Sequence, residues 1–117
     1  MKVLLVDDEE RFVSMLAKRL ILRGIDAHWL CSGEEALKEA EKNHYDLALL
    51  DVKMPCMSGI ELRKKLHELR PDMKFIFLTG HGSKNDFDAG SAKAAFYLAK
   101  PLKIEDVLEK IHEAVES

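Results

Sequence analysis

Three aspartates follow directly on apolar runs that have the character of buried parallel strands. Asp7 and Asp8 follow the run VLLV at residues 3–6, and Asp51 follows LALL at residues 47–50. Strands of one parallel sheet all end at the same edge, where open α/β folds bind their ligands. The three carboxylates are therefore expected to meet in one acidic pocket at the carboxyl end of a sheet.

Such a pocket needs compensation, because carboxylates this close cannot all stay ionised unless a cation joins them or one retains a proton. Ligands made only of oxygen suit Mg²⁺. Two further polar residues end strands at the same edge, since Thr79 follows FIFL and Lys100 follows YLA. The set suits a phosphoryl group, which a carboxylate attacks at phosphorus while the metal, the ammonium and the hydroxyl contact its oxygens. No histidine stands beside a nucleophile, so a Ser/His/Asp mechanism is not supported.

The elements that must position these residues are repeated βα units, because short leucine-rich or β-branched runs alternate with longer amphipathic segments. The pattern predicts strands at residues 2–6, 26–30, 46–50, 74–78 and 96–99, and helices at residues 9–23, 33–43, 59–69, 83–92 and 103–115. The fourth helix is the weakest, since it contains Gly90 and few large apolar residues. The fold class is therefore α/β, with a parallel sheet.

Local signals mark individual helices. The pairs Ser32 with Glu35 and Ser58 with Glu61 predict capping boxes at the second and third helices. The last helix should cover the sheet with an apolar stripe at helical spacing, made of Ile104, Val107, Leu108, Ile111 and Val115.

Size and charge limit what else the chain can do. Its 117 residues suit a single domain, residues 1–117, that buries a core without disulfides. The net charge of −3 gives no footprint for nucleic acid, although the first helix should carry a basic face of Arg11, Lys18, Arg19 and Arg23. Cys31 and Cys56 form no CxxC pair, and the N-terminus turns acidic before a signal-peptide core could form. We expect a cytoplasmic protein with reduced thiols that binds neither nucleic acid nor membrane.

Four segments, in order and over the whole chain, resemble the receiver domain of bacterial two-component response regulators: VDDEE, LLDVKMPCMSGIEL, FLTGHGS and YLAKP. The resemblance implies a doubly wound, flavodoxin-like fold with a five-stranded parallel sheet in the order 2-1-3-4-5 and five flanking helices. It also implies that Asp51 accepts a phosphoryl group from a sensor histidine kinase in a Mg²⁺-dependent reaction.

The same resemblance assigns roles to individual residues. Asp8 would bind Mg²⁺ directly with Asp51 and the backbone carbonyl of Lys53, and Asp7 would assist through the metal shell by way of water. Thr79 and Lys100 would contact the phosphoryl group. Tyr97 would be the switch residue whose rotamer is coupled to Thr79.

A receiver is a signalling domain, not an enzyme, and catalyses only its own phosphotransfer and autodephosphorylation. Its expected partners are the kinase, an output domain or effector protein, and a second copy bound through the fourth helix, the fifth strand and the fifth helix. The sequence leaves open whether the chain works alone or within a longer transcriptional regulator. An X–Pro bond tolerates the cis form at small cost, and Lys100–Pro101 is expected to be cis so that Lys100 points inward.

The sequence departs from the family pattern at two places. Lys93-Ala94 stands where a Gly-Ala pair is usual, and Cys56 stands where many relatives carry glycine. Three other readings stay open from the residues alone. Asp8 and Glu9 could simply cap the first helix. A haloacid-dehalogenase-like hydrolase also uses an aspartyl nucleophile with Mg²⁺, but with two aspartates two residues apart after its first strand. A flavodoxin-like flavin binder would need a glycine- and hydroxyl-rich loop where this chain has DDEER.

Overall fold

The structure is a computed structural model, and it describes residues 1–80 and 96–116. The strands are β1 (Lys2–Val6), β2 (Asp26–Leu30), β3 (Leu47–Asp51), β4 (Lys74–Thr79) and β5 (Tyr97–Ala99). The helices are α1 (Glu10–Ile21), α2 (Gly33–Lys42), α3 (Gly59–Leu69) and α5 (Ile104–Glu116). These bounds agree with the predicted elements to within three residues at every end. The predicted fourth helix, residues 83–92, and the Lys93-Ala94 pair lie outside the described residues.

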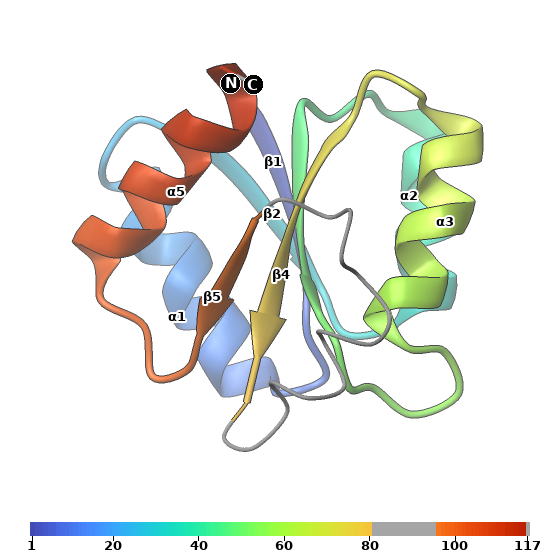
Figure 1. Cartoon of the computed structure of the whole chain (residues 1–117), viewed down its shortest axis with the longest axis horizontal. Helices are drawn as coiled ribbons and strands as arrows, with labels where there is room; N and C mark the ends of the chain where they lie inside the picture. The colour runs from blue at the N-terminus through green and yellow to red at the C-terminus, as the bar shows by residue number, and fades with distance from the viewer. Residues whose placement is uncertain (81–95, 117) are drawn as a thin grey trace.

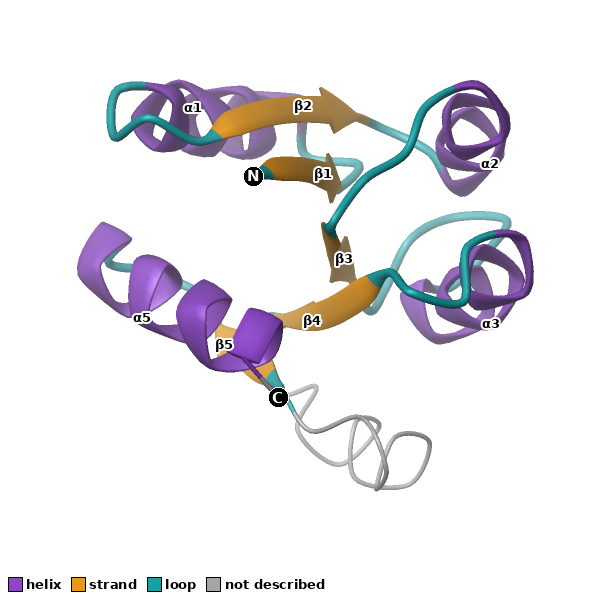
Figure 2. Ribbon diagram, turned by 90° about the horizontal axis from the view of Figure 1, so that it is seen from above, coloured by secondary structure: helices purple, strands orange, loops and turns teal. Residues whose placement is uncertain are grey.

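The five strands form one parallel sheet in the order β2-β1-β3-β4-β5, as predicted. Among the described helices, α1 and α5 cover one face of this sheet and α2 and α3 cover the other (Figures 1 and 2). All neighbouring strands are parallel, so the residues that follow their carboxyl ends share one edge of the sheet. No helix in the described part of the chain is long and apolar enough to cross a lipid bilayer.

The core consists of two layers because strand side chains alternate between the two faces. Val3 and Leu5 of β1 pack with α1 and α5, whereas Leu4 and Val6 pack with α2 and α3. All four side chains are completely buried. Each such side chain contributes about 1.5–3 kcal/mol by leaving water. The centre of the sheet, and with it the end of β1, is thereby held from both sides.

The two serine caps are present, each in a simpler form than a full capping box. The Ser32 hydroxyl accepts a hydrogen bond from the Glu35 amide at 3.2 Å, and the Ser58 hydroxyl accepts one from the Glu61 amide at 3.1 Å. On α5 the buried face is rotated slightly from the predicted apolar stripe, which included Val115. Ala114 is fully buried whereas Val115 is 37% exposed.

The loop between β3 and α3 has two unusual backbone positions. Cys56 has φ of 69°, and among the described residues it is the one non-glycine residue in the left-handed region. The family resemblance placed glycine there, and this backbone conformation is the physical reason, because a Cβ is disfavoured in it. Gly59 is the second position, since a Cβ built there would collide with the backbone carbonyl of Asp51. Helix α3 can approach the end of β3 this closely only without a side chain at residue 59.

We predict that Gly59→Ala lowers the free energy of unfolding by about 1–3 kcal/mol, because α3 must move away from a rigid backbone carbonyl. Gly33→Ala is the matched control, since Gly33 also follows a serine cap at the first position of a helix. A Cβ on Gly33 meets only the flexible side chain of Met57, and this variant should lose much less stability. Urea unfolding of both variants tests the prediction, and equal losses would refute it.

Candidate functional site

The three aspartates come together at the carboxyl edge of the sheet. Carboxylate oxygens of Asp7, Asp8 and Asp51 all lie within 4.8 Å of one another. Strands β1 and β3 are hydrogen-bonded neighbours in which Val6 pairs with Leu50, so the next residues, Asp7 and Asp51, fall side by side. Asp7 is fully buried, Asp51 is 6% exposed and Asp8 lies at the surface.

Lys100 supplies the positive charge of this cluster. Its ammonium nitrogen lies 2.7 Å from Asp7 Oδ2 and 3.8 Å from Asp51 Oδ1. The backbone amide of Lys100 donates to the carbonyl of Thr79 at 2.8 Å, which continues the β4–β5 ladder to the edge and fixes the starting point of the side chain. The Lys100–Pro101 peptide bond is cis, as predicted.

Burial dominates the electrostatics of the two inner carboxyl groups. It raises the pKa of Asp51 to about 7, with a further increase from the charge of Asp7, while Lys100 opposes both. Burial also raises the pKa of Asp7 against the opposing contact with Lys100. The pKa of Lys100 is also raised. Burial acts to lower this pKa, but the contacts of the ammonium with Asp7 and Glu9 outweigh the effect of burial.

These features test whether the site suits a divalent cation. The donors are carboxylate oxygens only, which is the ligand type of Mg²⁺, and they converge from two adjacent strands. One lysine does not neutralise three carboxylates, and the charges of Asp7 and Asp8 add to the effect of burial in raising the pKa of Asp51. A cation among these oxygens would remove the deficit, so the residues fit the metal predicted from the sequence.

The other predicted site residues occupy different positions around this cluster. Thr79 ends β4, is 4% exposed, and its hydroxyl donates to the Leu98 carbonyl at 3.4 Å. Tyr97 lies on β5 with its side chain 40% exposed. Lys53 follows β3 by two residues with an exposed side chain, and the role of its carbonyl stays a prediction. His81, the histidine nearest in sequence to Thr79, lies outside the described residues.

Sequence reasoning missed two residues of this region, Glu9 and Phe12. Glu9 Oε1 lies 2.7 Å from the Lys100 ammonium, and the Phe12 ring centroid lies 4.5 Å from it. The sequence allows Glu9 as a helix cap, and Glu9 does occupy the N-cap position of α1, but its side chain makes no capping bond. The sequence does contain a signal for this contact: Glu9 follows the aspartate pair directly, and the aromatic Phe12 comes one helical turn later.

The pKa of Asp51 gives a testable dependence of stability on pH in the absence of metal. Between its ordinary pKa of 3.8 and about 7, the folded state keeps a proton that the unfolded chain releases. Stability should therefore fall as pH rises through this window and level off above it. Asp51→Asn should flatten the slope and, at pH 8, raise the free energy of unfolding by about 2–4 kcal/mol. Urea unfolding in a chelating buffer measures both quantities, and an unchanged slope in the variant would contradict the assignment.

Comparison with known proteins agrees with this geometry. The sequence matches the family described as "Response regulator receiver domain" over residues 3–112. It is 36% identical to the alkaline phosphatase synthesis transcriptional regulatory protein PhoP of Bacillus subtilis (strain 168), over 94% of this chain and 46% of that protein. The chain thus spans about half the length of this relative, and it spans 26% of the transcriptional regulatory protein GlrR of Escherichia coli (strain K12), with which it is 32% identical over 97% of this chain.

Solved structures give the same answer. The response regulator TrrA of Thermotoga maritima, crystallised with Mg²⁺ and BeF, is 31% identical with a TM-score of 0.83, and the match covers 97% of each chain. A Burkholderia pseudomallei response regulator with a phosphorylated aspartic acid is 30% identical with a TM-score of 0.83, covering 99% of this chain and 74% of that one. The chain belongs to the response regulator receiver domain family of two-component systems.

Proposed function

We propose that the chain is a phosphorylation-activated receiver in which Asp51 takes a phosphoryl group from a sensor histidine kinase in a Mg²⁺-dependent reaction. The observation that carries the proposal is the convergence of Asp7, Asp8 and Asp51 within 4.8 Å, with Lys100 at their side. Two relatives support it by what their structures contain. One holds a phosphorylated aspartic acid, and the other holds Mg²⁺ with BeF.

In this proposal Asp51 is the nucleophile. Asp8 and Asp51, with the Lys53 carbonyl, would hold Mg²⁺ directly, and Asp7 would hold it through water. The metal would neutralise charge on the phosphoryl oxygens and keep Asp51 ionised at neutral pH. Lys100 and the Thr79 hydroxyl contact the transferred group. The protein itself catalyses only this transfer and the later loss of the phosphoryl group, so we propose a signalling domain and not an enzyme with an external substrate.

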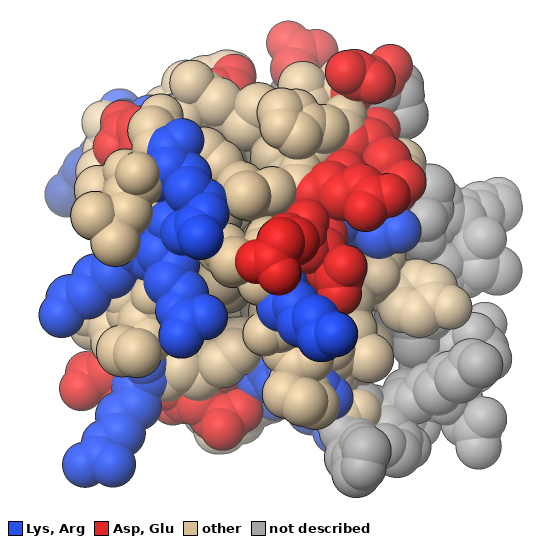
Figure 3. All heavy atoms as spheres, turned by 90° about the vertical axis from the view of Figure 1, so that its left-hand side faces the viewer, with Lys and Arg blue, Asp and Glu red and all other residues tan. Residues whose placement is uncertain are grey.

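The proposed partners are proteins: the kinase, an output domain or effector, and a second copy bound through β5, α5 and the residues predicted from the sequence as the fourth helix. Direct nucleic-acid binding is not part of this proposal. Figure 3 shows one face of the molecule, on which basic side chains lie mostly on one side and acidic ones mostly on the other. A nucleic-acid backbone crossing both would meet repulsion on the acidic side. We propose a cytoplasmic location, as expected from the sequence.

Incubation with acetyl phosphate and Mg²⁺ should add one phosphoryl group per chain, detected as a stoichiometric gain in intact mass. Asp51→Asn and chelation of the metal should each abolish the gain, because one removes the nucleophile and the other its charge compensation. Asp8→Ala should weaken Mg²⁺ binding and slow the labelling while the acceptor remains.

Asp46→Asn is the matched control for Asp51→Asn, because Asp46 is an exposed carboxylate just before the opposite end of the same strand, where it accepts a hydrogen bond from the Lys2 amide. It should label at the wild-type rate. Uptake of one phosphoryl group by Asp51→Asn at that rate would show that another residue is the acceptor. Continuous turnover of acetyl phosphate without a mass gain would favour a hydrolase.

The proposed switch runs from the phosphoryl group through Thr79 to Tyr97. A Thr79 hydroxyl that turns toward a phosphoryl oxygen gives up its long 3.4 Å bond to the Leu98 carbonyl and vacates space into which Tyr97 can turn. Tyr97, 40% exposed in this structure, should then become less accessible to solvent. Treatment with beryllofluoride should lower its reactivity toward iodination, and Thr79→Ala should remove that change. Unaltered reactivity of Tyr97 in the treated wild type would rule out this coupling.

A further inference from the structure

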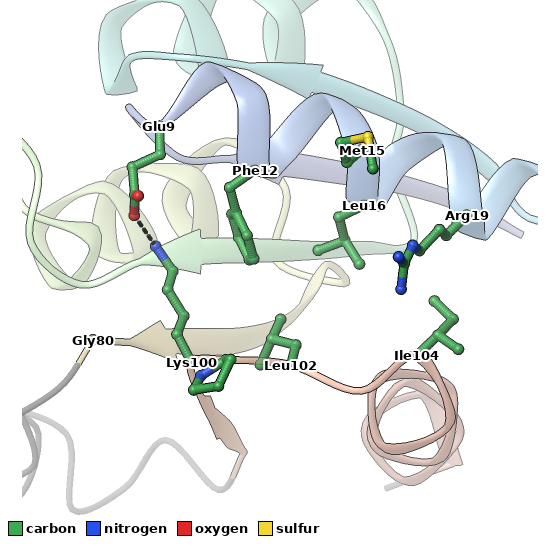
Figure 4. Close-up of a pocket in the computed structure, with 10 residues that line it drawn as sticks. Glu9, Phe12, Met15, Leu16, Arg19, Gly80, Lys100, Leu102 and Ile104 are labelled. Carbon is green, nitrogen blue, oxygen red and sulfur yellow. Dashed lines mark hydrogen bonds and ion pairs between the residues drawn. The ribbon is translucent and has the colours of Figure 1, made fainter.

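Lys100 is held by two residues of α1 that do not belong to the metal-binding set. Its ammonium donates to Glu9 Oε1 at 2.7 Å and lies over the Phe12 ring, 4.5 Å from the ring centroid. Figure 4 shows the lysine side chain reaching from the end of β5 to Glu9 at the beginning of α1, with Phe12 beside it. The two residues are three apart and therefore lie on one side of the helix.

The direction of the Glu9 side chain is unusual for its place in the helix. A polar residue at the N-cap commonly accepts a hydrogen bond from the first-turn amides, but Glu9 makes no such bond. The amide of Glu9 itself donates to Asp7 Oδ1 at 2.9 Å. Asp7 thus fixes the backbone of Glu9, and the Glu9 carboxylate is directed across the mouth of the acidic pocket toward Lys100.

The three carboxylates around Lys100 differ in how easily they can be replaced. Asp7 is fully buried and contacts the ammonium at 2.7 Å, so releasing it would strand a charge in the interior. Asp51 is 3.8 Å away, beyond hydrogen-bond distance. The Glu9 side chain is 63% exposed and can return to water. The ammonium must therefore move to reach an anionic group carried on Asp51. Of its two close contacts, the exposed one with Glu9 is lost at lower cost in that movement than the buried one with Asp7.

We propose that Glu9 is a positioning residue that competes with the phosphoryl group on Asp51 for Lys100. This inference rests on the proposed function of Asp51. In the unphosphorylated protein Lys100 binds Asp7 and Glu9, and in the phosphorylated protein it keeps Asp7 and exchanges Glu9 for a phosphoryl oxygen. Glu9 thereby lowers the stability of the phosphorylated state relative to the resting one.

The surroundings allow this exchange without rearranging the core. Glu9, Phe12 and Lys100 line one end of an open cavity of about 580 Å³ between α1 and the segment that leads from β5 into α5. The released carboxylate has solvent on one side and this cavity on the other. The ammonium already lies 3.8 Å from Asp51 Oδ1, so it needs to move only a short way to reach a group carried on that residue.

The test compares Glu9→Gln with Glu10→Gln, which removes the same charge one position later on the exposed side of α1. Glu9→Gln should tighten the binding of beryllofluoride with Mg²⁺ and speed labelling by acetyl phosphate, each by roughly two- to fivefold, the range of an exposed ion pair. Glu10→Gln should change both by much less. Equal values for Glu9→Gln and the wild type would overturn the proposal, as would an equal gain in Glu10→Gln.

A double-mutant cycle separates competition for Lys100 from simple repulsion of an anionic donor. In a Lys100→Met background the competition disappears, so Glu9→Gln should bring no further gain in beryllofluoride affinity. The same gain in both backgrounds would show that Glu9 acts through its general field and would overturn the proposal. Failure of the wild type to bind beryllofluoride or to be labelled would instead refute the proposed function. Urea unfolding of each variant verifies that the comparisons are made on folded protein.

Discussion

The site depends on the meeting of two strand ends at one edge of the sheet. Because β1 and β3 are adjacent and in register, formation of the sheet places Asp7 and Asp51 side by side. Their burial makes the charged state costly, which is visible in the raised pKa of both groups. The hydrophobic layers on the two faces of the sheet provide the stability that holds this unfavourable arrangement in place. The lysine at this edge acts on a charge imbalance that the topology creates, and a metal ion bound there would act on the same imbalance.

Much of the fold follows from the sequence because its signals are local or nearly so. Strands buried on both faces appear as continuous apolar runs, and the serine caps mark where α2 and α3 begin. The acidic cluster was predictable for a topological reason, since all strands of a parallel sheet end together. The capping pairs were predicted correctly in position. Both serines accept a hydrogen bond from the helix amide, and the Ser32 hydroxyl also donates to the Glu35 carboxylate at 3.0 Å.

The remaining features depend on contacts between distant segments, which a pattern of residue types does not encode. The choice between Ala114 and Val115 as the buried residue of α5 depends on the rotation of the helix against the sheet. The left-handed backbone of Cys56 depends on how the loop closes between β3 and α3. Glu9 looked like a capping residue because its partner lies near the other end of the chain. In each case local propensity is outweighed by packing.

The contact between Glu9 and Lys100 joins residues that are 91 positions apart. A ribosome releases the three aspartates long before it releases this lysine, so the nascent chain carries an acidic cluster that still lacks its ammonium. A chain that stopped before residue 100 would therefore carry the three carboxylates without the ammonium that lies beside them in the finished sheet.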